Sequence, residues 1–173
     1  NKVLNIQKQN NLINKLDFFL TADQIKSLKE INDDLSSSNK MFRLLQGDVG
    51  SGKTIVSLLT AYNSVNSGFQ VAVMAPTEIL ARQHFTLAKK IFSKKLRLEL
   101  ISGKSIYKEK KIILDNLFNH KIDIIFGTHA IFQKKVNFKK LGLIIIDEQH
   151  KFGVNQRKRL SDKGGDNCDI LLM

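Results

Sequence analysis

A phosphate-binding loop occupies residues 47–54, which read Gly-Asp-Val-Gly-Ser-Gly-Lys-Thr with the spacing G-x-x-x-x-G-K-[ST]. An apolar run at residues 42–45 precedes the loop, and a helix-compatible stretch follows it from Thr54. This order predicts a strand, a glycine-rich turn and a helix whose N-terminus attracts anions. A chance match to the pattern is expected in roughly one chain in a hundred of this length. The sequence therefore predicts a nucleoside triphosphate site.

The residues of the loop are expected to make different contacts with the nucleotide. Three glycines allow consecutive N–H groups to point inward at phosphate oxygens. Lys53 has the length and charge to reach the outer phosphates, and the Thr54 hydroxyl suits Mg²⁺. We assign nucleotide contact to the loop residues Gly47, Asp48, Val49, Gly50, Ser51, Gly52, Lys53 and Thr54.

Two adjacent carboxylates follow the apolar run at residues 143–146. This pattern places Asp147 and Glu148 at the carboxyl end of a buried strand, at the sheet edge that also holds the loop. Asp147 is predicted to hold Mg²⁺, and Glu148 to orient and deprotonate an attacking water. The alternative interpretation is an acidic strand end that caps a helix. Such strand ends are common, but a complete phosphate loop in the same chain makes this interpretation less favoured.

Composition excludes several classes of protein. The chain has 173 residues, 42% of them hydrophobic and 25% charged, which fits one globular domain. No apolar run approaches the roughly 18 residues of a membrane span. The single cysteine, Cys168, cannot form an internal disulfide, so we expect a cytoplasmic protein.

The net charge of +12 favours a nucleic-acid partner, because basic surfaces bind polyanions. Most of the basic residues are lysines, and the chain is also rich in Asn and Ile. The Lys-rich region at residues 89–111 is therefore interpreted as a solvated face more than a dedicated groove.

Strand-like and helix-like segments alternate after residue 40. Short apolar runs lie at residues 42–45, 71–75, 98–101, 122–126, 143–146 and 170–173, and amphipathic stretches lie at 54–67, 78–92 and 106–118. We predict an α/β fold with a parallel sheet covered by helices on both faces. A capping box at Thr21 to Gln24 predicts a further helix to about residue 35. Residues 1–20 are expected to form a connecting helix outside the core.

Five sequence segments, in order, resemble motifs of superfamily 2 helicases. Asp147-Glu148-Gln149-His150 is similar to a DEAH-type box, and residues 47–54 are similar to the first helicase motif. Together with Pro76-Thr77-Glu78, Gly127-Thr128-His129 and Phe152-Gly153-Val154, they resemble the RecG family of bacterial ATP-dependent helicases. The resemblance implies a RecA-like P-loop NTPase fold and ATP with Mg²⁺ as cofactors. It further implies branched DNA as partner.

The resemblance also implies further site residues and a domain organisation. Gln24 would recognise adenine, Gln149 and His150 would couple the nucleotide site to the rest of the motor, and the residues expected to contact DNA are Pro76, Thr77, Arg82, Gly127, Thr128 and His129. Residues 21–173 would be a first RecA-like domain of a monomeric motor. A wedge domain and the second RecA-like domain, which completes the site, would be absent from a truncated chain.

Two other functions stay open at this point. A transcription-repair coupling translocase shares the Gly-Asp-Val-Gly and Phe-Gly-Val segments but typically has a second Glu where Gln149 stands. A non-catalytic module could use nucleotide only to gate an interaction. A guanine-specific GTPase is disfavoured, because Asn14-Lys15-Leu16-Asp17 precedes the phosphate loop instead of following a late strand.

Overall fold

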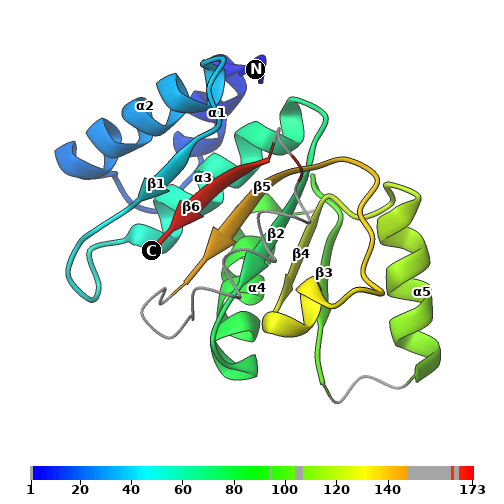
Figure 1. Cartoon of the computed structure of the whole chain (residues 1–173). Helices are drawn as coiled ribbons and strands as arrows, with labels where there is room; N and C mark the ends of the chain where they lie inside the picture. Colours follow the sequence, from blue (N-terminus) through cyan, green and yellow to red (C-terminus); the bar gives the residue numbers. More distant parts are fainter. Residues whose placement is uncertain (1, 94, 104–106, 148–164, 166–167) are drawn as a thin grey trace.

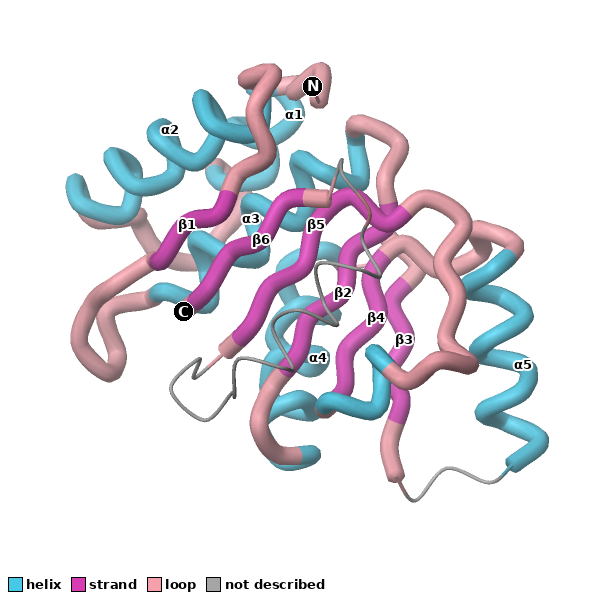
Figure 2. The backbone as a smooth tube through the Cα atoms, in the orientation of Figure 1, coloured by secondary structure: helices cyan, strands magenta, loops and turns pink. Residues whose placement is uncertain are grey.

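The chain folds around a parallel sheet of six strands in a computed structural model that describes residues 2–93, 95–103, 107–147, 165 and 168–173. The strands are β1 (Phe42–Leu44), β2 (Gln70–Met74), β3 (Leu98–Ile101), β4 (Ile124–Gly127), β5 (Leu141–Ile146) and β6 (Asp169–Leu172). Their spatial order is β1-β6-β5-β2-β4-β3, and every paired neighbour runs parallel (Figures 1 and 2). Because the strands are parallel, all their carboxyl ends meet at one edge of the sheet.

Several of the helices begin at side-chain caps that the sequence supplies. They are α1 (Ile6–Ile13), α2 (Ala22–Ser36), α3 (Lys53–Asn66), α4 (Glu78–Phe92) and α5 (Tyr107–Phe118), with a 3₁₀ helix η1 (His129–Phe132). The predicted capping box of α2 is confirmed: Thr21 and Gln24 bond each other's backbone N–H groups. Thr77 caps α4 by accepting a hydrogen bond from the Leu80 N–H.

Helices cover both faces of the sheet, as predicted. On one face, α2, α3 and α4 bury side chains such as Leu59 and Phe92 against Val71, Val73 and Ile145. On the other face, α5 and η1 contribute the apolar residues Ile113, Leu117 and Ile131, which pack against Ala72, Ile125 and Ile144. Figure 1 shows α1 and α2 beside the β1 edge and α5 beside the β3 edge. The buried runs at β2, β4, β5 and β6 explain why these strands lack polar alternation.

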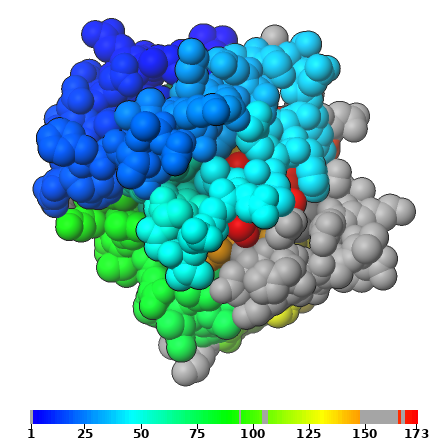
Figure 3. All heavy atoms as spheres, turned by 90° about the vertical axis from the view of Figure 1, so that its left-hand side faces the viewer, coloured from blue at the N-terminus to red at the C-terminus, as the bar shows by residue number. Residues whose placement is uncertain are grey.

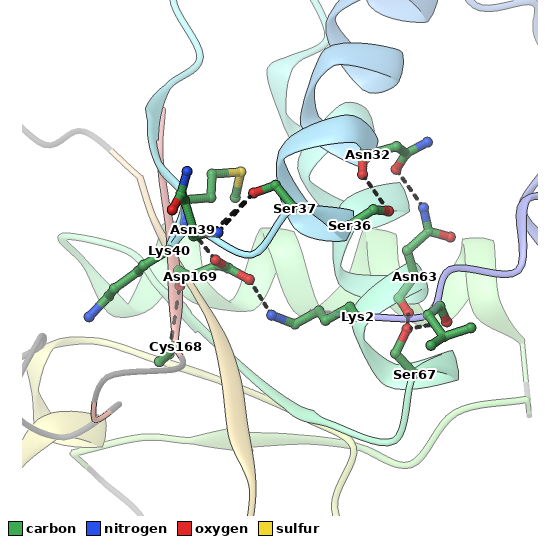
Figure 4. A network of polar contacts seen from close by, with 12 residues as sticks. Lys2, Asn32, Ser36, Ser37, Asn39, Lys40, Asn63, Ser67, Cys168 and Asp169 are labelled. Atoms are coloured by element: carbon green, nitrogen blue, oxygen red, sulfur yellow. Dashed lines mark hydrogen bonds and ion pairs between the residues drawn. The ribbon is translucent and has the colours of Figure 1, made fainter.

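The N-terminal segment is packed more tightly than the sequence predicts. A helix forms there as expected, but its predicted place outside the core is wrong, because Leu12 is 2% exposed within the core cluster. Before this helix, the Lys2 ammonium pairs with the Asp169 carboxylate on β6, and both side chains are buried. Figure 4 shows Lys2 pointing at Asp169. This contact joins residues that are 167 positions apart, so no local sequence pattern predicts it.

Among the described residues, none of the helices combines the length and apolarity needed to cross a bilayer.

Candidate nucleotide site

Five loop segments leave the same edge of the sheet. The phosphate loop follows β1, residues 75–77 follow β2, residues 102–103 follow β3, residues 128–129 follow β4, and Asp147 follows β5. The strand order interleaves β6 and β5 between β1 and β2, so segments distant in sequence become neighbours. The expectation that the loop and Asp147 share one edge is therefore confirmed.

The phosphate loop has the backbone that its glycines permit. Gly50 and Gly52 have φ of 83° and 80°, in the left-handed region that disfavours other residues. Gly52 is the N-cap of α3 and has no side chain to bond the helix N–H groups, so that end stays open to an anion. Residues 47–51 are exposed, and Figure 3 shows the cyan segment that contains them at the surface beside the blue N-terminal helices.

The Lys53 ammonium lies against the loop that precedes it. It donates to the carbonyl oxygens of Gly47 at 2.5 Å and Asp48 at 3.0 Å. The charge is thus held at the mouth of the loop, within reach of a bound polyphosphate. Ser51 closes the turn by donating its N–H to the Asp48 carbonyl at 3.1 Å.

Gln24 joins the helix α2 to the phosphate loop. Its side-chain oxygen accepts from the Thr21 N–H at 2.9 Å, and its amide nitrogen donates to the Ser51 carbonyl at 2.9 Å. A Cβ built at Gly52 would lie 2.1 Å from that amide nitrogen, so glycine is needed for the approach. The structure brings Gln24 to the nucleotide loop, and its contact with adenine stays a prediction.

Asp147 is held from two sides. Its N–H donates to the Met74 carbonyl at 2.8 Å, and its carboxylate Oδ2 is 2.6 Å from Nε2 of His84 on α4. His84 was missed in the sequence, although a polar residue within the apolar stripe of a helix is a usable signal. The predictions for Glu148, Gln149 and His150 fall outside the described residues.

The segment after β2 contains the start of α4 and a carboxylate that bonds the segment after β3. Thr77 is exposed and caps α4, Pro76 precedes it, and Arg82 is exposed on the outer side of α4. Glu78, which the sequence did not single out for a role of its own, accepts from the Gly103 N–H at 2.6 Å and from the Ser102 hydroxyl at 3.2 Å. Arg82, Glu78 and Ser102 line a cavity of about 720 Å³ along α4.

The segment at the end of β4 begins with a buried glycine and continues with residues that are partly or fully exposed. Gly127 is buried, and a Cβ there would lie 2.7 Å from Ile131 and 2.8 Å from Ile101, so close packing explains this glycine. His129 is exposed and Thr128 is half-buried. Their predicted role in contacting DNA is compatible with this exposure, and it stays a prediction.

The residues present fit a nucleotide-bound Mg²⁺. The Thr54 hydroxyl and the Asp147 carboxylate are hard oxygen ligands of the kind that Mg²⁺ takes beside substrate phosphates. A carboxylate offers about four lone-pair positions, so the bond to His84 leaves acceptor capacity on Asp147. In the part of the chain that the structure describes, no cluster of three or more His, Cys, Asp or Glu side chains could hold a metal independently.

Comparison with known proteins places this geometry in a family. The profile of DEAD/DEAH box helicases matches residues 21–168. The chain belongs to the DEAD/DEAH box helicase family. A relative named ATP-dependent DNA helicase RecG, from Streptococcus pneumoniae serotype 4, is 51% identical over 158 residues, which are 91% of this chain and 23% of the relative. The RecG of Borreliella burgdorferi is 48% identical over 163 residues, 94% of this chain and 24% of the relative.

Two solved structures agree with the fold. A structure of RecG bound to a three-way DNA junction has a TM-score of 0.89 and 42% identity, over 99% of this chain and 23% of that one. Mss116p bound to single-stranded RNA and AMP-PNP has a TM-score of 0.76 at 21% identity, over 99% of this chain and 40% of that one, and supports the fold alone. The RecA-like fold and the resemblance to RecG helicases are confirmed. The chain spans about a quarter of the length of its RecG relatives.

Proposed function

We propose that this chain is the ATP-binding motor domain of a RecG-like DNA helicase, which couples ATP hydrolysis to remodelling of branched DNA. The observation that carries the proposal is the arrangement of Lys53 and Asp147 at one sheet edge, in a chain about half identical to RecG helicases. The open N-terminus of α3 adds backbone donors for phosphate oxygens.

A few side chains would carry out ATP hydrolysis. Lys53 would neutralise charge that develops on the outer phosphates, and Thr54 and Asp147 would hold Mg²⁺. A bound Mg²⁺ would supply charge neutralisation at the reacting phosphate. Glu148 is proposed as the base that takes a proton from the attacking water, because it follows Asp147 directly in the sequence.

Branched DNA is proposed as the partner on two grounds. The RecG structure that this chain resembles is bound to a three-way junction. The chain also has a net charge of +12, which favours a polyanionic partner. Thr77 and His129 are exposed at the same sheet edge as the phosphate loop, so DNA bound there would lie near the nucleotide. Backbone contacts of this kind position a strand without reading its sequence.

We further propose that segments outside these 173 residues complete the ATP site, since the RecG relatives are about four times longer. A second RecA-like domain would provide the opposite wall. The 173-residue chain alone should then bind Mg–ATP weakly and hydrolyse it slowly, while the full-length protein turns it over when DNA is present. Full DNA-stimulated hydrolysis by the chain alone would contradict this part of the proposal.

The deciding experiment compares DNA substrates on the full-length protein. ATP hydrolysis is measured with a three-way junction, with linear duplex of the same length, and without DNA. We expect the junction to stimulate hydrolysis most, and a fork substrate to be remodelled only with ATP. Absence of hydrolysis in the presence of bound nucleotide would favour a gated binding module. Displacement of stalled RNA polymerase without fork remodelling would favour a transcription-repair translocase.

A further inference from the structure

His84 occupies an unusual position on α4. The residues that α4 buries are Ala81, His84, Ala88 and Phe92, spaced three or four apart along its inner side. The other three are apolar, and the two alanines allow the helix to lie close to the sheet. The histidine is only 8% exposed, and a polar side chain buried this deeply requires a hydrogen-bond partner.

The partner of His84 is the carboxylate that the proposed function assigns to Mg²⁺. Nε2 of His84 lies 2.6 Å from Oδ2 of Asp147, and the two side chains are 9% and 17% exposed. The Asp147 N–H is fixed by the Met74 carbonyl, so the backbone of the residue is set by the sheet. The histidine then removes the remaining freedom of the side chain, because it bonds one of the two carboxylate oxygens.

The helix that carries His84 is itself anchored. Thr77 caps its N-terminus, and Glu78 in its first turn bonds Gly103. Phe85, the next residue after His84, packs edge-on against Phe126 of β4 with ring centroids 5.7 Å apart. A ligand carboxylate is oriented well only when its own partner is fixed in this way.

We propose that His84 is a positioning residue that orients the Asp147 carboxylate toward nucleotide-bound Mg²⁺. The inference rests on the proposed function, because it requires Asp147 to act as a metal ligand. Its specific content is that a side chain of α4, outside the phosphate loop and the acidic box, sets the affinity of the site for Mg²⁺.

Two nearly isosteric substitutions separate this role from packing. His84→Gln keeps an amide donor near the position of Nε2, whereas His84→Met fills a similar volume without a donor. Phe85→Leu is the matched control, because it disturbs the same helix beside His84 without touching Asp147. His84→Ala serves as a second deletion if the methionine variant does not fold. Folding is checked by thermal unfolding.

The measurement is the Mg²⁺ concentration that half-saturates binding of a fluorescent ADP analogue to the full-length protein, with binding in EDTA as reference. We expect His84→Met to raise this concentration about 10- to 100-fold, the usual cost of losing a partner of a metal ligand, and to leave binding in EDTA unchanged. His84→Gln should recover most of the loss. Phe85→Leu should lower the unfolding temperature and leave the Mg²⁺ requirement unaltered.

Three results would overturn the inference. One is a folded His84→Met variant, or the alanine variant in its place, with the Mg²⁺ dependence of the parent. Another is His84→Gln that is folded and as impaired as His84→Met. A third is an equal rise in the Mg²⁺ requirement for Phe85→Leu. A parent protein that binds no nucleotide at any Mg²⁺ concentration would overturn the proposed function as well, so the two failures are distinguishable.

Discussion

The side-chain amide of Gln24 donates a hydrogen bond to the carbonyl oxygen of Ser51 at 2.9 Å, which ties the start of α2 to the phosphate loop. The same side chain accepts from the Thr21 N–H and so completes the capping box of α2. One residue therefore stabilises a helix end and fixes the loop that is proposed to hold phosphate.

Gln24→Glu separates the two roles. A carboxylate still accepts from Thr21 but cannot donate to Ser51, and its charge opposes bound phosphate. We expect Gln24→Glu to keep the cap but to lose about 1 kcal/mol of stability with the hydrogen bond to Ser51, and to bind nucleotide more weakly. Gln24→Ala should lose about 1 kcal/mol of stability in addition, because it also removes the hydrogen bond to the Thr21 N–H. Urea unfolding measures the stability of the two variants, and calorimetric titration with ADP measures their nucleotide binding. A glutamate variant that binds nucleotide like the parent would contradict the proposed role of Gln24 in fixing the loop.

Gly52 and Gly50 form a matched pair for the effect of a single methyl group. Both have φ near 80°, so alanine costs roughly 1–2 kcal/mol of backbone strain at each. At Gly52 the new Cβ would also displace the amide of Gln24, whereas at Gly50 no atom of the described residues lies within 4 Å. We expect Gly52→Ala to be the more damaging to stability.

A double-mutant cycle checks the cause of this difference. Gly52→Ala should cost less in a Gln24→Ala background, since the displaced amide is then absent. Gly50→Ala should cost the same in both backgrounds. Equal costs of Gly52→Ala in the two backgrounds, measured by urea unfolding, would exclude the contact as the explanation.

The buried pair of Lys2 and Asp169 should contribute to stability only as a pair. After Lys2→Met, the Asp169 carboxylate stays buried and still accepts from the Met41 N–H at 2.7 Å, but it has lost its cationic partner. Asp169→Asn leaves the Lys2 ammonium buried without its carboxylate partner. We expect each single change to destabilise the fold by about 3–5 kcal/mol. The double variant should be clearly more stable than the sum of the two losses predicts. Additive losses in thermal unfolding would show that the two side chains act independently.

His120 should make stability depend on pH. Burial, followed by the positive charge of Arg97, lowers the pKa of His120 below its ordinary value of 6.5. The unfolded chain then binds a proton at a higher pH than the folded chain, so stability is lost as pH falls from about 6.5 toward the lowered pKa. His120→Asn keeps the residue's positive φ of 57° accessible and removes the titration. Urea unfolding at several pH values should show a flatter profile for this variant as pH falls below about 6.5.

Local sequence patterns were sufficient to predict the six strands, the five α-helices and the edge of the sheet that the phosphate loop and Asp147 share. The apolar runs at β4 and β5 identify buried parallel strands, and parallel strands bring the phosphate loop and Asp147 to one edge. The bounds of α4 agree with the prediction, because Thr77 caps it and its apolar spacing is regular.

The contacts that patterns missed are long-range and polar. His84 meets Asp147 across 63 positions, and Gln24 meets Ser51 across 27. Such pairs depend on how α4 and α2 lie on the sheet, which no local window contains. Lys2 belongs to the same class, because its partner is on the last strand. For α1 the loose apolar spacing did not predict its two buried residues, Gln9 and Leu12.

The central claim is that Lys53, at the mouth of the glycine-rich loop, holds the phosphates of ATP. The most direct measurement is calorimetric titration of the full-length protein with Mg²⁺ and a non-hydrolysable ATP analogue, for the parent, Lys53→Ala and Lys90→Ala. Lys90 is an exposed lysine on α4 and serves as the charge-matched control. We predict that Lys53→Ala weakens binding about 10- to 100-fold, since hydrogen bonds to charged groups contribute about 1.5–3 kcal/mol, and that Lys90→Ala binds like the parent. Equal binding by the parent and Lys53→Ala, both folded, would contradict the account.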